Sequence, residues 1–138
     1  MSQYFDVGDE TLWNPSNGAA RLFLRHVGLY EDELGVPSGI GPMESDECQV
    51  DPVAYGAFVN ALLEWRDGTR HGIVDALSAG FLGTAVALAE RAGVELRWPE
   101  PRVGLEGRRD IQVPGPLRQD WAGAARERAR ELDRSMAR

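Results

Sequence analysis

Four carboxylates and the only cysteine of the chain fall within eight residues, the densest group of side chains that could do chemistry. The residues are Glu44, Asp46, Glu47, Cys48 and Asp51. Carboxylate oxygens are the ligands that hard divalent cations prefer. A calcium loop also needs alternating oxygens, a glycine at its sixth position and a distal glutamate, and the sequence after Glu44 or Asp46 lacks this register. We therefore expect no metal and no cofactor, and a solvated acidic segment.

Cys48 could act as a nucleophile if a histidine lowered the pKa of its thiol, and His26 and His71 are the only histidines. The neighbouring carboxylates of Asp46 and Glu47 have the opposite effect on this pKa, because negative charge disfavours a thiolate. The sequence favours a buried, structural Cys48. It identifies no catalytic residue and leaves open whether the protein is an enzyme.

Arg21 and Arg25 are one helical turn apart and could bind a carboxylate or phosphate group together if they face a pocket. Such arginines more often pair with acids of a neighbouring element. His26 follows on an apolar stripe, where a hydrogen-bonded histidine is commoner than a ligand. His71 begins a predicted helix and could pair with Asp75 one turn on.

The charge of the chain is uneven. The net charge is -7, all 15 basic residues are arginines, and residues 1–67 carry 12 acids against 3 arginines. Nucleic acids and anionic membranes are polyanions and repel such a surface. Arginines near the C-terminus alternate with acids and form no strong basic patch. We expect no nucleic acid and no membrane as partner, and instead a protein with a basic surface; a homo-oligomer stays open.

Several features predict a cytoplasmic protein with one domain over residues 1–138. A single cysteine excludes an intramolecular disulfide, which suits a reducing compartment. Residues 1–15 contain no basic residue and no apolar run, so we expect no secretory signal. The longest uncharged stretch, residues 76–89, is shorter than the roughly 20 apolar residues that cross a bilayer.

Capping residues and apolar spacing predict the elements of the first half. Residues 4–7 and 11–13 are β-prone and flank a Gly-Asp-Glu turn, which permits a hairpin. A helix is expected to start within residues 14–17 and to run to about Leu34, with Gly35 as its stop and an apolar stripe packed on the core. This stripe consists of Ala19, Leu22, Phe23, His26, Val27, Tyr30 and Leu34. Residues 35–51 are rich in glycine and proline, so we expect an irregular segment that is functional or mobile.

The second half of the sequence predicts mainly helix. Helices are expected from Asp51 to Gly68, over about 69–92, and over 116–136 at the C-terminus. Residues 94–98 alternate as in a strand, and 111–113 offer a second. The sequence thus predicts a mainly α fold, or an α+β fold: a small bundle of about four helices with a minor β hairpin or short strands.

Two stretches resemble a family of small uncharacterised actinobacterial cytosolic proteins. They are Leu-Trp-Asn-Pro-Ser-Asn-Gly at 12–18, with Arg-Leu-Phe-Leu at 21–24, and Pro-Ser-Gly-Ile-Gly-Pro-Met-Glu at 37–44, with Asp-Glu-Cys at 46–48. The resemblance spans roughly the first two thirds of the chain. It implies a cytosolic, single-domain protein, and it transfers no activity, cofactor or site residue.

We expect an interaction protein whose acidic first half, above all residues 31–33 and 44–51, faces a basic partner, as inhibitor, immunity or antitoxin-like proteins do. The candidate binding residues are Arg21, Arg25, His26, Glu44, Asp46, Glu47, Cys48 and Asp51. The alternative is a small enzyme or ligand-binding domain with a pocket between the first helix and the 35–51 loop. Such a domain would have a concave site with converging polar groups.

Overall fold

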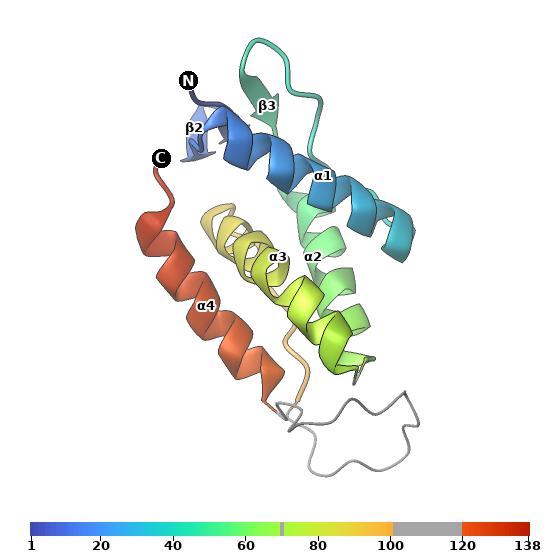
Figure 1. Cartoon of the computed structure of the whole chain (residues 1–138). Coiled ribbons are helices and arrows are strands. Elements are labelled where there is room, and N and C mark those ends of the chain that lie inside the picture. Colours follow the sequence, from blue (N-terminus) through green and yellow to red (C-terminus); the bar gives the residue numbers. More distant parts are fainter. Residues whose placement is uncertain (70, 101–119) are drawn as a thin grey trace.

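The predicted mainly α fold with a minor β part is confirmed by a computed structural model, which describes residues 1–69, 71–100 and 120–138. The helices of the described residues are α1 (Asn17–Leu34), α2 (Pro52–Asp67), α3 (Gly72–Arg91) and α4 (Trp121–Ser135). The strands are β1 (Tyr4–Val7), β2 (Glu10–Trp13) and β3 (Glu47–Gln49). Helix α3 lies at the centre, with α4 on one side and α1 and α2 on the other (Figure 1). The predicted strand at 111–113 and residues 116–119 of the predicted last helix lie outside the described residues.

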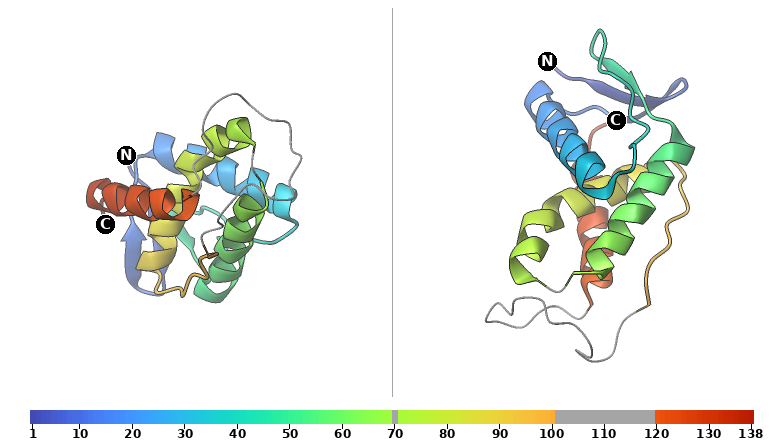
Figure 2. Two further views of the ribbon diagram at one scale, coloured as in Figure 1. Left: turned by 90° about the horizontal axis from the view of Figure 1, so that it is seen from below. Right: turned by 90° about the vertical axis from the view of Figure 1, so that its right-hand side faces the viewer.

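The three strands form a small sheet at one end of the helices, close to both termini (Figure 2). Strands β1 and β2 make the predicted antiparallel hairpin, and Gly8 in its turn has a φ of 59°. Strand β3 pairs in parallel with β1, so that the sheet order is β2-β1-β3. The segment 35–51, expected to be irregular, therefore contains a strand. The edge of β1 that does not face β2 offers unpaired backbone N–H and C=O groups, and β3 pairs with them. The glycines and prolines of residues 35–51 do not predict this pairing.

Helix α1 begins and ends where its capping residues predict. The Ser16 hydroxyl accepts a hydrogen bond from the Ala19 N–H, and Gly35 ends the helix with a φ of 66°. The buried face consists of Ala20, Phe23, Val27 and Tyr30. Part of the predicted core stripe is exposed instead, because Ala19 and Leu22 point away from the core. The apolar surface of α1 is therefore wider than the surface that its own domain covers.

The C-terminal half of α3 is largely buried, and aromatic rings join the helix to α1. The ring of Phe81 lies 4.7 Å from that of Tyr30 and 5.7 Å from that of Phe23. Helix α3 is long and apolar enough to cross a membrane by length and composition. Half of its apolar window is buried inside the domain, and core helices of soluble proteins pass the same test. The packing identifies α3 as the core helix of this domain.

Residues 94–98, predicted as a strand, do not pair with the sheet. They run beside α2, where the side chain of Asn60 accepts a hydrogen bond from Arg97 N at 2.7 Å and donates one to Glu95 O at 3.3 Å (Figure 2). Gly56 of α2 makes room for Val94, since a Cβ there would lie 2.7 Å from a Val94 methyl group. The side-chain amide of Asn60 thus makes hydrogen bonds to this segment of the kind that a neighbouring strand would make.

Arg91, at the end of α3, holds the C-terminal helix against the domain. Its side chain is nearly buried and pairs with the Asp133 carboxylate of α4. It also donates hydrogen bonds to Met136 O at 2.7 Å and to Leu12 O of β2 at 2.6 Å. Close packing of α4 on α3 requires Gly83, where a Cβ would lie 2.6 Å from Arg128 Cγ. The terminal helix therefore packs on its own chain.

Candidate interaction surfaces

An acidic turn, residues 44–47, leads into β3, which begins at Glu47. The backbone N–H groups of Glu44 and Glu47 donate to each other's carbonyl oxygen at 2.9 and 3.0 Å. Ser45 and Asp46 between them have φ values of 51° and 65°. The Asp46 carbonyl accepts a hydrogen bond from Tyr4 N at 2.8 Å, which fixes the turn to β1. The three carboxylates of the acidic turn are exposed on an ordered backbone.

Other carboxylates of the first half are also exposed. They are Asp9, Glu10, Asp32, Glu33, Asp51 and Glu64. Among the residues that the structure describes, Glu10 is the only one of these, or of the acidic turn, with an ion pair, at 3.7 Å from Arg138. Glu31 is half-buried and accepts a hydrogen bond from Ser38 N at 2.9 Å, so it adds little to this surface.

The acidic residues do not converge on a cation. Within the described ranges, no group of three or more histidine, cysteine or acidic side chains could hold a metal ion. Asp51 caps α2, where its Oδ1 accepts hydrogen bonds from Val53 N at 3.0 Å and Ala54 N at 3.3 Å. The carboxylates are therefore arranged as separate surface charges.

Cys48 is buried beneath the acidic turn, as the sequence predicts. It lies in β3 opposite Phe5 of β1. Burial, together with the negative charge of Asp6, raises the pKa of the Cys48 thiol to about 12. A thiol in this state is a poor nucleophile and is out of reach of a partner protein.

The three candidate residues of α1 lie apart from the acidic turn. Arg21 and Arg25 are exposed, and within the described part of the chain their side chains make no hydrogen bond or ion pair. His26 is half-buried, and its Nδ1 donates to Leu22 O at 2.9 Å because a carbonyl oxygen can only accept. The ring of His26 stacks on Phe81 at 5.8 Å. This hydrogen bond leaves Nε2 of His26 for another partner.

An apolar groove of about 530 Å³ runs between α1, α3 and α4. It is lined by Trp13, Ala19, Leu22, Phe23, His26, Ala76, Leu77, Gly80, Phe81, Thr84, Arg128, Leu132 and Met136. Two leucines on its walls are largely open to solvent: Leu22 is 59% exposed and Leu77 is 74% exposed. The alternative hypothesis of an enzyme or ligand-binding domain expects a pocket between the first helix and the 35–51 loop. This groove instead lies on the side of α1 that faces α3 and α4.

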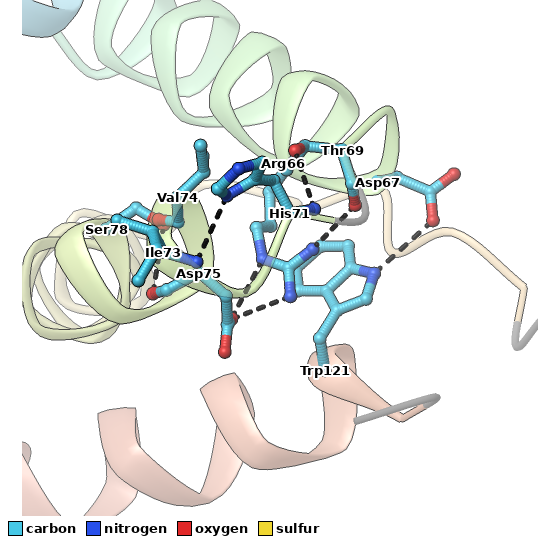
Figure 3. A network of polar contacts seen from close by, with 9 residues as sticks. All are labelled: Arg66, Asp67, Thr69, His71, Ile73, Val74, Asp75, Ser78 and Trp121. Carbon is cyan, nitrogen blue, oxygen red and sulfur yellow. Dashed lines mark hydrogen bonds and ion pairs between the residues drawn. The ribbon is translucent and has the colours of Figure 1, made fainter. Parts of the chain in front are cut away.

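A buried arginine that sequence reasoning did not single out joins three helices (Figure 3). Arg66 of α2 binds Asp75 of α3 at 2.7 Å and Thr69 O at 3.2 Å. Its guanidinium lies 5.0 Å from the ring centre of Trp121 in α4, whose indole N–H donates to Asp67 at 3.3 Å. All these partners belong to the described chain, so the cluster is a structural connection between α2, α3 and α4.

The predicted pair of His71 with Asp75 is wrong, because Arg66 occupies the carboxylate of Asp75. His71 instead caps α3: its Nδ1 accepts a hydrogen bond from Ile73 N at 3.2 Å. Arg66 lies at helical spacing from the apolar residues Leu62 and Leu63 of α2. An arginine on an apolar stripe was the available signal of a buried ion pair.

The whole chain, residues 1–138, matches a family of unknown function (DUF6086), and it belongs to this family. The resemblance to an uncharacterised family is confirmed, and the match extends beyond the first two thirds of the chain. No curated protein and no solved structure matches the chain.

Proposed function

We propose that this member of the DUF6086 family is a cytoplasmic protein–protein interaction domain that binds a basic surface through its acidic turn. The observation that carries the proposal is the uncompensated charge: three exposed carboxylates on one ordered turn, with no ion pair to any described residue. Inhibitor, immunity and antitoxin-like proteins work in this way. Complementary charge accelerates the encounter with a basic partner and suppresses binding of acidic ones.

The backbone of the acidic turn supports this role. Two reciprocal hydrogen bonds close the turn, and a third ties it to β1. The carboxylates of Glu44, Asp46 and Glu47 therefore need little backbone ordering when a partner binds, and the entropic cost of association is reduced.

Among the described residues, Arg66 and Arg91 do not neutralise the acidic surface, because they are turned inward and bind acids of α3 and α4. The described ion pair between an arginine of the second half and an exposed acid of the first half is Arg138 with Glu10, and exposed pairs of this kind contribute little energy. The other exposed carboxylates of the first half thus have no ion pair with any described residue.

The test uses two charge variants of the full chain with equal changes in net charge. The first, Glu44→Gln with Asp46→Asn and Glu47→Gln, removes the carboxylates and keeps the backbone bonds; asparagine also tolerates the left-handed conformation of residue 46. The control, Glu95→Gln with Glu127→Gln and Glu131→Gln, changes exposed acids elsewhere.

Each protein is used to capture partners from cytosol at about 50 mM and about 500 mM salt. We expect a partner that the unchanged protein and the control retain at low salt, that high salt releases, and that the acidic-turn variant fails to bind. Equal capture by both variants would overturn the proposal, as would capture that salt does not weaken.

The apolar groove favours a second candidate function, the binding of an apolar small molecule. Its volume of about 530 Å³ lies within the roughly 300–1,000 Å³ of typical ligand pockets. Gly80 lines the groove, and a Cβ there would meet nothing within 4 Å, so Gly80→Leu places a side chain at the groove with open space around its Cβ, and circular dichroism checks that the fold is kept. An apolar fluorescent probe that binds the unchanged protein should bind this variant weakly. Equal fluorescence from both proteins would rule out the groove as its site.

A further inference from the structure

We infer that two copies of the chain pair through the outer face of α1, packed antiparallel about a twofold axis at Leu29. Leu22, which also lines the apolar groove, and Leu29 lie two helical turns apart on α1 and are 59% and 58% exposed. Single exposed leucines are common on protein surfaces, so the pairing is inferred from the charges around them. The charges around Leu29 identify the occupant as a second copy.

The four neighbours of Leu29 on the helix surface are a set of basic and acidic side chains. Arg25 precedes Leu29 by four residues and Asp32 follows it by three, and with 3.6 residues per turn both lie about 40–60° to one side. His26 and Glu33 lie at about the same angles on the other side. On each side, the basic residue or histidine comes before Leu29 and the acid comes after it.

An antiparallel twofold arrangement converts this order into contacts. A residue that precedes Leu29 in one copy lies opposite a residue that follows Leu29 on the same side of the other copy. Arg25 therefore faces Asp32 of the second copy, and His26 faces Glu33 of the second copy. Each contact occurs twice, so four complementary pairs surround a central contact of Leu29 with its symmetry mate.

The charges also determine where the axis lies. An axis midway between Leu22 and Leu29 would instead bring the two Arg25 side chains together and the two His26 side chains together. Among the described residues, Arg25, Asp32 and Glu33 have no hydrogen bond or ion pair through their side chains, so these groups are available. His26 retains Nε2, because Nδ1 is bound to Leu22 O.

Charge exchange tests this arrangement in the full chain, because a homodimer carries every substitution twice. Arg25→Asp places a carboxylate opposite Asp32 of the second copy, and Asp32→Arg places two arginines together. Each single variant should weaken dimerisation by roughly tenfold or more, and the double variant Arg25→Asp/Asp32→Arg should recover it to within about threefold. Leu29→Asp should abolish the dimer.

The readout is the dimer dissociation constant from sedimentation equilibrium, with circular dichroism to show that each exposed substitution leaves the fold intact. Arg134→Asp, an exposed change of the same kind on α4, is the control and should dimerise like the unchanged chain. A monomer at every concentration up to about 500 µM, or a double variant as weak as the single variants, would overturn the inference. The acidic-turn variant should dimerise normally, which separates this surface from the proposed partner site.

Discussion

Removing the charge of Asp75 should destabilise the fold more than removing that of a surface acid. In Asp75→Asn the side chain keeps its size, but the Arg66 guanidinium loses its counterion. Arg66 is 6% exposed and Asp75 is 35% exposed, so the pair is neither fully buried nor fully solvated. Breaking a buried pair costs roughly 3–5 kcal/mol, whereas an exposed pair contributes roughly 0.2–1 kcal/mol.

The expected loss lies between these limits. Arg66 keeps its hydrogen bond to Thr69 O and its contact with the Trp121 ring, and water reaches part of residue 75. We expect Asp75→Asn to lower the free energy of unfolding by about 2 kcal/mol and the melting temperature by roughly 6 °C. Urea unfolding should show a lower midpoint with an unchanged slope, since the surface exposed on unfolding is the same.

Glu10→Gln provides the matched control, because Glu10 and Arg138 form an ion pair at the surface. Its effect should be below about 0.5 kcal/mol. A double-mutant cycle with Arg66→Met should give a coupling energy of about 1.5–2 kcal/mol between residues 66 and 75. Equal losses for Asp75→Asn and Glu10→Gln, or a coupling energy near zero, would refute the reasoning that burial strengthens this pair.

Three further predictions concern single residues. Cys48 should react with a thiol reagent at pH 8 only after urea unfolds the protein. The folded state raises the pKa of the Cys48 thiol to about 12. The free energy of unfolding should therefore fall as the pH rises above about 9, where the thiol of the unfolded chain ionises. Gly39→Ala should lower the free energy of unfolding in urea by about 3 kcal/mol, since Gly39 has a φ of 74° and a Cβ there would lie 2.6 Å from Ala54 Cβ. Gly8→Ala is the control: Gly8 has a φ of 59° and open space around it, so this change should lower the free energy by about 1 kcal/mol. Asn60→Leu should increase hydrogen exchange at Arg97 N, and unchanged protection there would contradict the role of this amide.

Local signals were enough to predict where the helices of the first half begin and end. Ser16 and Gly35 limit α1, and Asp51 caps α2, as their side chains and backbone preferences predict. Strand β3 could not be predicted in the same way. Its partner, β1, lies about 40 residues earlier, and pairing across that distance is not encoded in local composition.

Apolar spacing predicts which face of a helix is apolar, but it does not show how much of that face the domain covers. Leu22 belongs to the same repeating pattern as Phe23 and Val27, yet it is exposed while they are buried. For the same reason the groove was missed: its walls come from α1, α3 and α4, and their distance in space is a tertiary property. Arg66 was missed because composition rules treat arginine as a surface residue.

The guanidinium of Arg91 has a consequence for the order of events on the ribosome. It bonds to Leu12 near the start of the chain and to Met136 near its end, and Asn14 N donates a hydrogen bond to Ala137 O at 2.8 Å. The N-terminal hairpin emerges first but lacks these contacts until residue 137 has been translated and has left the exit tunnel. Nascent chains halted before that point should therefore be cut readily by protease within the hairpin, and chains in which residue 137 has left the tunnel should be protected there.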